Sequence, residues 1–98
     1  MNWTELMAEL RKHKGEFANV NMGVIRHKTE LCEDGSLCCP LAFLVRKRGK
    51  KVPSNLSWEL FDNTLSIERH VRLAIMYSAD GQVAFNNNLR KELEEACL

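Results

Sequence analysis

The chain has 98 residues, of which 45% are hydrophobic and 28% are charged, and its formal net charge is +1. This composition is ordinary for a folded domain and argues against extensive disorder, while the charge is well short of that of a dedicated nucleic-acid-binding protein. No apolar run has the length of a signal peptide or of a membrane span. We therefore expect a single cytoplasmic domain over residues 1–98 with no membrane partner.

The first predicted helix begins after Asn2, which has Glu5 three residues later in the arrangement of a capping box. Apolar residues follow at helical spacing and form one face: Trp3, Leu6, Met7 and Leu10. Gly15 can end this helix, because glycine tolerates the left-handed conformation that follows many helices.

Residues 20–39 have the composition of extended chain, with β-branched residues and a turn signal at Glu33-Asp34-Gly35. Gly35 can adopt the positive φ that a tight hairpin turn requires. This pattern predicts a β-hairpin that turns at residues 33–35. Because an isolated two-stranded hairpin is only marginally stable in water, we expect it to pack against helices.

The second predicted helix begins at Pro40, since proline is favoured in the first turn, and Gly49 follows it as a stop. A third helix is expected next, with Ser54 or Asn55 as its cap and a break at residues 62–64. Its apolar residues are Leu56, Trp58, Leu60 and Phe61.

Ser66 is the expected cap of a fourth helix that ends at Asp80-Gly81, and a last helix is expected to begin within residues 86–88. The buried face of this last helix is predicted to contain Leu89, Leu93 and Ala96, next to Cys97. Together these patterns predict a mostly helical α+β domain of about five short helices packed with one small antiparallel β-hairpin. Its core is expected to include Trp3, Trp58 and Phe61.

Cys38 and Cys39 precede Pro40 and raise the question of a reactive thiol. A cysteine at a helix N-terminus can be a nucleophile, because exposed amides stabilise its thiolate, and His27 is a conceivable basic partner for Cys39. However, no glycine lies between Cys39 and Arg46 to build an oxyanion-binding loop, and free cysteine usually packs as a small hydrophobe. We therefore favour packing at a strand-to-helix corner and predict no catalytic residue and no enzymatic activity.

The candidates for a zinc site are His27, Cys32, Cys38 and Cys39. Structural zinc sites favour ligand pairs about two to four residues apart, whereas five residues separate Cys32 from Cys38. Cys38 and Cys39 are adjacent, so they point to opposite faces of an extended chain, and strain opposes a disulfide between them. The sequence therefore predicts reduced thiols, no metal and no cofactor.

Positive charge is concentrated in the basic segment, which consists of Arg46, Lys47, Arg48, Lys50 and Lys51. Residues 1–52 carry ten Lys and Arg against six Asp and Glu, a net charge of +4, and residues 53–98 carry four against seven, a net charge of −3. The basic segment can bind phosphates or an acidic protein surface. It can equally be a solvated helix end that the helix dipole stabilises, and no interleaved aromatic residue indicates base stacking.

Residues 58–79 offer an alternative, because two helices joined by a short connection resemble a helix-turn-helix. In that arrangement the helix from Ser66 would read DNA with Arg69, His70 and Arg72, which are expected to face outward. Glu68 and the net negative charge of this half of the chain argue against DNA reading, since both repel phosphate.

Short motifs over most of the chain resemble those of a group of small uncharacterised bacterial and phage-type proteins. They are an N-terminal W…L…L helix, Gly23-Val24-Ile25-Arg26, the step from Gly35 to Cys39-Pro40-Leu41, the helix end Ala79-Asp80, and a final helix with Leu89-Arg90, Leu93 and Ala96. The resemblance implies a mobile-element setting, in which small proteins, anti-CRISPR proteins among them, often dock on host machinery.

These observations predict a non-enzymatic binding protein, encoded by a phage or prophage, that docks on a host protein or nucleoprotein complex as an anti-CRISPR-type inhibitor would. The basic segment would steer the encounter, and exposed apolar side chains beside it would supply the hot spot. The alternative is a DNA-binding module that uses the helix from Ser66, with nucleic acid as its partner.

Overall fold

The computed structural model describes residues 1–53, 58–82 and 86–98, which form five helices and a two-stranded antiparallel sheet. In chain order the elements are α1 (Trp3–Arg11), β1 (Phe17–Asn21), β2 (Val24–His27), α2 (Pro40–Lys47), α3 (Trp58–Leu65), α4 (Arg69–Ala79) and α5 (Asn87–Cys97). The predicted class, a mostly helical α+β fold with one small hairpin, is confirmed.

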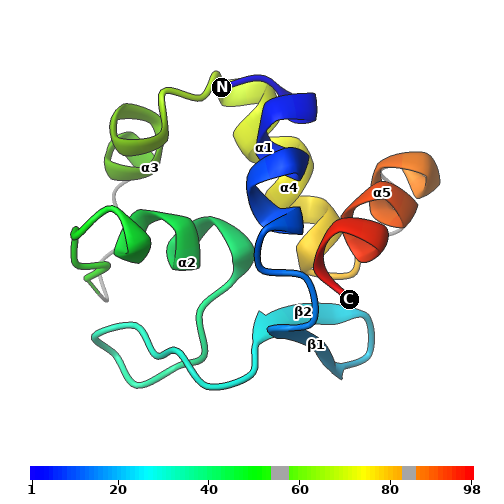
Figure 1. Cartoon of the computed structure of the whole chain (residues 1–98), viewed down its shortest axis with the longest axis horizontal. Coiled ribbons are helices and arrows are strands. Elements are labelled where there is room, and N and C mark those ends of the chain that lie inside the picture. The colour runs from blue at the N-terminus through cyan, green and yellow to red at the C-terminus, as the bar shows by residue number, and fades with distance from the viewer. Residues whose placement is uncertain (54–57, 83–85) are drawn as a thin grey trace.

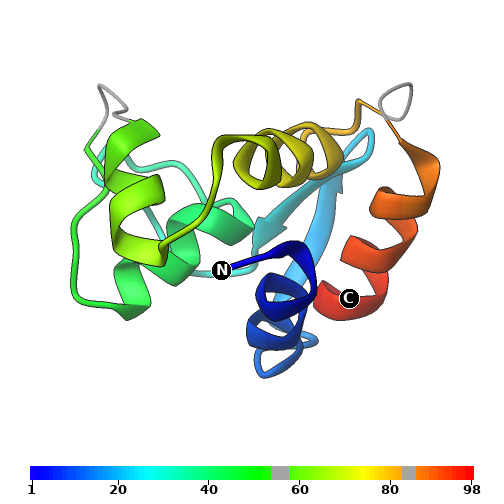
Figure 2. The same ribbon diagram turned by 90° about the horizontal axis from the view of Figure 1, so that it is seen from above.

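The helices form two groups on either side of α4 (Figures 1 and 2). On one side α2 packs against both α3 and α4, and on the other α5 packs against both α4 and α1. The β1–β2 hairpin lies below the helices in Figure 1, where β2 contacts α2 and α4. None of the described helices is both long and apolar enough to cross a lipid bilayer.

The capping box predicted for α1 is confirmed. The Asn2 side chain accepts a hydrogen bond from the Glu5 amide at 2.8 Å, and the Glu5 carboxylate accepts one from the Asn2 amide at 3.1 Å. These bonds satisfy amides that would otherwise lack partners at the first turn. The helix thereby fixes Leu6, Met7 and Leu10 as its buried face.

The hairpin turns at a different place from the one predicted. Asn21 pairs with Val24, so the turn consists of Met22 and Gly23, whose positive φ values of 38° and 89° suit a two-residue hairpin turn. The predicted turn at residues 33–35 does form, but it closes only one isolated bridge, between Leu31 and Leu37. Leu31, at the bridge, is 47% exposed, so burial of that face does little to extend the bridge into a sheet.

The start of α2 at Pro40 is confirmed, and Cys39 is its N-cap. The Cys39 sulfur accepts a hydrogen bond from the Ala42 amide at 3.4 Å, a role that serine or aspartate more often fills. Residues 40–45 are all buried, and Gly49 follows the helix with a φ of +81°. The first turns of α2 are therefore buried in the core.

The boundary between α3 and α4 differs from the predicted one. The expected break at residues 62–64 is wrong, because α3 continues to Leu65 and the chain turns at Ser66, whose φ is +51°. Ser66 is not a cap; Glu68 is the N-cap of α4 and makes no side-chain capping bond. Asp62 lies within α3, and its carboxylate accepts a hydrogen bond from Arg72 of α4. The predicted caps Ser54 and Asn55 lie outside the described residues.

The last helix begins where predicted, but Leu89, predicted to be buried, is only partly buried, and Arg90 is buried instead. Asn86 caps α5 by accepting hydrogen bonds from the Asn88 and Leu89 amides, and the helix buries Leu93, Ala96 and Cys97. Every helix, and both strands of the hairpin, contributes to one cluster of buried apolar side chains.

The two tryptophans depart from their predicted place in the core, whereas Phe61 is buried as predicted. Trp58 is 41% exposed. Trp3 is only partly buried, and its indole N–H donates to the Glu92 carboxylate at 2.6 Å. An aromatic residue can thus fall at a position where the helical spacing of apolar residues predicts burial and still lie at the edge of the core.

Candidate functional site

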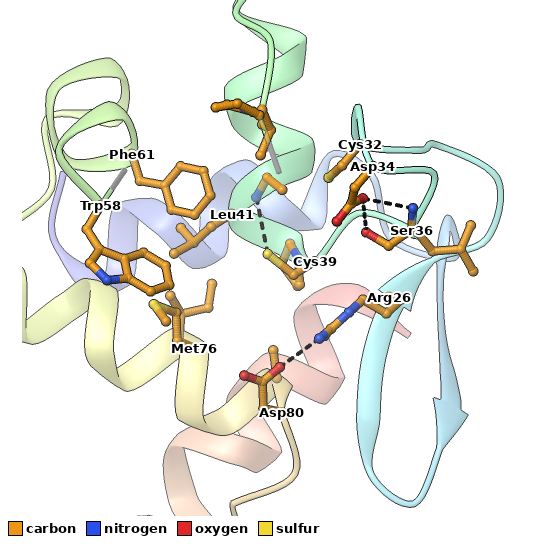
Figure 3. A pocket seen from close by; sticks show the side chains of 17 residues that line it. Arg26, Cys32, Asp34, Ser36, Cys39, Leu41, Trp58, Phe61, Met76 and Asp80 are labelled. Carbon is orange, nitrogen blue, oxygen red and sulfur yellow. Dashed lines mark hydrogen bonds and ion pairs between the residues drawn. The ribbon is translucent and has the colours of Figure 1, made fainter. Parts of the chain in front are cut away.

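A cavity of about 260 Å³ lies where the N-terminus of α2, Trp58 and Phe61 of α3, the C-terminal half of α4 and the turn of residues 32–37 meet (Figure 3). Its wall is largely apolar and includes Leu41, Phe61, Ile75 and Met76. Concave, mainly apolar cavities with a few polar groups are the usual form of binding sites in proteins. The cavity is therefore the first candidate for a functional site.

Trp58 gives this cavity a partly exposed aromatic edge. Its ring lies 6.0 Å from that of Phe61 in an edge-to-face arrangement, and the guanidinium carbon of Arg72 lies 5.4 Å from the Trp58 ring. These contacts fix the indole from two sides while a large part of its surface remains open to solvent. Trp58 is therefore held in place before any partner arrives.

Polar residues line the opposite side of the cavity, and their charges are already paired. Arg26 of β2 donates to the Asp80 carboxylate at the end of α4, with 2.8 Å between Nη2 and Oδ1. The Asp34 carboxylate accepts hydrogen bonds from the Ser36 hydroxyl and amide, and these bonds hold the pKa of Asp34 below its ordinary value. The cavity therefore presents no unpaired charge from these residues to a ligand.

Cys39 faces the cavity (Figure 3), but the helix N-terminus does not activate it. Burial raises the pKa of the Cys39 thiol above its ordinary value, and the hydrogen bond from the Ala42 amide opposes this only in part. Since the thiolate is the nucleophilic form of cysteine, a raised pKa disfavours reaction.

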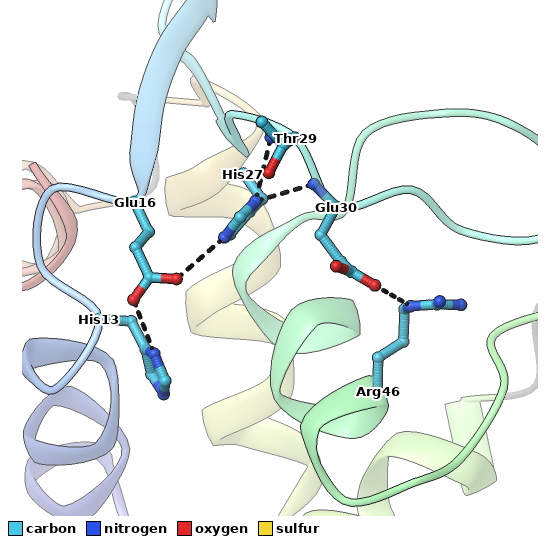
Figure 4. A network of polar contacts seen from close by, with 6 residues as sticks. All are labelled: His13, Glu16, His27, Thr29, Glu30 and Arg46. Carbon is cyan, nitrogen blue, oxygen red and sulfur yellow. Dashed lines mark hydrogen bonds and ion pairs between the residues drawn. The ribbon is translucent and has the colours of Figure 1, made fainter.

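His27 is not the basic partner that the sequence left open for Cys39. Its Nδ1 accepts hydrogen bonds from the Thr29 and Glu30 amides at 3.1 and 2.9 Å, so the ring proton is on Nε2, which faces Glu16 at 3.3 Å (Figure 4). The ring also stacks on Phe43, with 4.5 Å between the centroids. Both nitrogens thus serve to tie β2 to its neighbours.

The four candidate zinc ligands do not form a metal centre. Within the described parts of the chain, no group of three or more His, Cys, Asp and Glu side chains could hold a metal ion. One pair of these ligands does meet, since the sulfur atoms of Cys32 and Cys38 are 3.2 Å apart. Both are free thiols in this structure.

Hydrogen bonds to basic neighbours lower the pKa of two further exposed carboxyl groups. Glu16 bridges His13 and His27, with 2.9 Å between its Oε2 and the His13 Nδ1, and these bonds lower its pKa, that from His13 most (Figure 4). Glu95 of α5 accepts two hydrogen bonds from Arg11 of α1, and these lower the pKa of its carboxyl group. The charged form of each group is therefore favoured by folding.

We expect Glu16→Gln to reduce the acid sensitivity of the fold. The pKa of Glu16 is lower in the folded than in the unfolded chain, so its contribution is fully present above the ordinary carboxyl pKa of about 4 and is lost as the pH falls through the lowered pKa. Urea unfolding of the variant between neutral pH and pH 3 should show a smaller acid-induced loss than the wild type. Glu59→Gln, an exposed change on α3, is the control. Parallel pH profiles for Glu16→Gln and the wild type would contradict this assignment.

The structure ties down three of the five cations of the basic segment. Arg46 donates from Nε to the Glu30 carboxylate at 2.8 Å, and Arg48 lies 3.6 Å from a carboxylate oxygen of Glu9. The Lys47 ammonium lies 5.8 Å from the centre of the Phe43 ring. These residues therefore contribute to packing at the C-terminal end of α2 as well as to surface charge.

The remaining two cations have no partner among the described residues. Lys50 and Lys51 are exposed, and neither side chain has a hydrogen-bond or ion-pair partner within residues 1–53, 58–82 and 86–98. The chain passes directly from Lys51 into Val52 and Pro53, which line the cavity. Positive charge and the apolar cavity are thus joined by one continuous stretch of chain.

The residues of the DNA-binding alternative do not form an outward-facing set. Arg72 is buried, contrary to the prediction, because its Nε donates to the Asp62 carboxylate at 2.8 Å and its guanidinium covers Trp58. Arg69 and His70 are exposed as expected, and His70 lies 3.2 Å from a carboxylate oxygen of Glu68. Only two of the three predicted contacts therefore face solvent.

Sequence reasoning missed the cavity, the exposed edge of Trp58 and the role of Arg90. Arg90 is a buried residue of α5 that donates to the carbonyl oxygens of Gly23 and Ser78 and to the Glu94 carboxylate. No local signal identifies these features, because each depends on which distant segments meet. The turn signal between Cys32 and Cys38 does indicate that these two thiols can meet.

The fold and the cavity define a small, mostly helical α+β domain with an apolar pocket beside a short positively charged stretch. Comparison of the chain with protein-family models, with curated proteins and with solved structures returns no match. The function proposed below therefore depends on this chain's own residues.

Proposed function

We propose that this chain is a non-enzymatic binding protein that docks on an acidic surface of a host protein, either alone or within a nucleoprotein complex. The observation that supports it most is the continuity of Lys50 and Lys51 with the cavity edged by Trp58. An apolar side chain of the partner would enter the cavity, and acidic groups around it would face the two lysines.

Trp58 has the properties of a binding hot spot. Tryptophan is enriched among the residues that dominate interface energies, and hot spots lie in pockets from which binding excludes water. Arg72 and Phe61 hold the indole in place, so little conformational entropy would be lost when a partner covers it. The lysines would act mainly on the association rate, because exposed charges steer partners over several ångströms.

The mobile-element setting that the sequence resemblance implies suggests the role of such docking. A phage or prophage protein of this kind would inhibit host machinery by occupying a surface, as anti-CRISPR-type inhibitors do. The lack of an activated thiol at Cys39 and the engaged nitrogens of His27 support contact over bond-making as the mode of action.

We expect Trp58→Ala to weaken partner binding roughly tenfold or more, and Lys50→Ala with Lys51→Ala to slow association, most strongly at low salt. Partners retained from host lysate by the immobilised wild-type chain would be identified by mass spectrometry and titrated against each variant. Lys50 and Lys51 are exposed, so the lysine variant should leave circular dichroism and the thermal midpoint nearly unchanged. Trp58→Ala also removes contacts with Phe61 and Arg72, so circular dichroism must show that this variant is folded before its binding is compared.

The matched control is Lys28→Ala with Lys91→Ala, which removes the same charge from exposed positions away from the cavity. Binding that Trp58→Ala and the Lys50/Lys51 variant leave unchanged would contradict the proposal. So would selective, strongly salt-dependent binding to a DNA duplex that Arg69→Ala and His70→Ala abolish, since that result would favour the DNA-binding alternative.

A further inference from the structure

The two arms of the turn at residues 32–37 bring a pair of thiols together. The Cys32 amide donates to the Ser36 carbonyl at 2.8 Å, and the Cys38 amide donates to the Glu30 carbonyl at 2.9 Å. The Leu31–Leu37 bridge lies between these two bonds. Because the backbone is held on both sides of the bridge, the sulfur atoms of Cys32 and Cys38 stay 3.2 Å apart, close enough for one thiol to hydrogen-bond the other.

The two thiols differ in their exposure to solvent, and this difference decides which of them reacts first with a reagent in solution. Cys32 is partly exposed and lines the cavity, whereas Cys38 is fully buried in the core. Burial, followed by the contact with Cys32, raises the pKa of the Cys38 thiol well above its ordinary value, so its attack is the slow second step and depends on the closeness of the two sulfur atoms. A reagent in solution would therefore meet Cys32 first, and Cys38 would be placed to attack whatever forms there.

We infer that Cys32 and Cys38 form a reversible disulfide by exchange with a low-molecular-weight disulfide of the glutathione type. The Cys32 thiol loses its proton and its sulfur attacks one sulfur of the reagent, whose own S–S bond breaks and releases one thiol. The Cys38 thiol then loses its proton, and its sulfur attacks the Cys32 sulfur and displaces the second thiol. In total two protein thiols and one disulfide give one protein disulfide and two small thiols.

The sulfur atoms must approach from 3.2 Å to about 2.0 Å, the length of a disulfide bond. The backbone hydrogen bonds to Ser36 and Glu30 hold the two arms of the turn together with the cysteine side chains next to each other. Forming the disulfide therefore requires only a small local movement. The other two thiols are placed differently. The Cys39 sulfur is engaged by the Ala42 amide, and Cys97 is fully buried at the end of α5.

The bond would change the cavity, because Cys32, Asp34 and Ser36 belong to its wall. Oxidation would cross-link the base of this turn and restrict its movement, so the width of the cavity would depend on the thiol–disulfide balance around the protein. This inference stands on the Cys32–Cys38 geometry alone and does not depend on the proposed function.

The test is a redox titration of the folded wild-type chain in mixtures of reduced and oxidised glutathione, quenched with acid and alkylated. As the oxidised fraction rises, we expect the number of alkylated thiols to fall from four to two and peptide mapping to show a bond between Cys32 and Cys38. Dithiothreitol should restore all four thiols. The bond should also form faster in the folded chain than in the denatured chain.

Variants separate the two steps. Cys39→Ala and Cys97→Ala should leave the bond intact, Cys32→Ala should abolish it, and Cys38→Ala should stop at a glutathione adduct on Cys32. Four alkylated thiols at every ratio would overturn the inference, as would a bond to Cys39 or a persistent adduct on the wild type. Equal rates in the folded and denatured chains would assign the bond to sequence proximity and overturn it too. If Cys38→Ala fails to fold, the thiol count and the peptide map of the wild-type chain still test the inference.

Discussion

Replacing Arg90 with alanine is expected to lower the free energy of unfolding by about 2–4 kcal/mol, one of the two largest effects of a single substitution that we predict. The Arg90 guanidinium is buried and donates to the Gly23 carbonyl in the hairpin turn and to the Ser78 carbonyl in α4. It also donates to the Glu94 carboxylate at 2.8 Å. One side chain of α5 thus joins the hairpin, α4 and its own helix.

The cost arises because alanine cannot replace these donors and leaves a space where the arginine stem packed. Urea unfolding followed by circular dichroism measures the effect. Lys91→Ala is the matched control, since Lys91 is the next residue of α5 and is exposed, and we expect it to stay within about 0.5 kcal/mol of the wild type. Equal stabilities for the two variants would show that Arg90 does not hold these elements together.

Replacing Gly81 with alanine is expected to destabilise the fold by roughly 3 kcal/mol, because conformational strain and a steric clash add. Gly81 has a φ of +79°, and a Cβ atom there would lie 3.0 Å from the Met22 carbonyl oxygen and 3.3 Å from the Gly23 carbonyl. These are backbone atoms of the hairpin turn, so they cannot rotate away as a side chain could. Glycine at this position lets the end of α4 approach the hairpin.

Gly49→Ala provides a matched control for backbone strain. Its φ of +81° is nearly the same, but no atom lies within 4 Å of the Cβ that alanine would add. We expect Gly49→Ala to cost about 1 kcal/mol, the price of the left-handed conformation alone. The difference between the two variants in thermal or urea unfolding measures the close approach. A difference near zero would mean that the hairpin turn moves aside readily.

Local signals predicted the helix ends best. The capping box at Asn2 and Pro40 in the first turn of α2 act within four residues and are used as predicted, and α5 begins within the predicted residues 86–88. The prediction failed where contacts between distant segments decide. Asp62 remains helical because it pairs with Arg72 of α4, and the hairpin turns at Met22-Gly23, which places Ile25 and His27 in the core.

The candidate site was only partly predictable for the same reason. The basic segment was visible as a run of charge, but its pairing with Glu30 and Glu9 depends on how the loop and α1 pack beside α2. The cavity draws its wall from β2, the turn of residues 32–37, α2, α3 and α4, so no stretch of sequence could show it. Trp58 fitted the apolar periodicity of α3, and only the packing shows that its edge is open.

The pairing of α1 with α5 has a consequence for how the protein is made. Synthesis from the N-terminus makes α1 before α5, so the apolar face of Leu6, Met7 and Leu10 has no covering helix until α5 has been made. Closing so long a loop is entropically costly, and the hydrogen bond from the Gly15 amide to the Cys97 carbonyl can form only when both segments have been made. A stalled nascent chain would therefore expose this helix to chaperones and proteases.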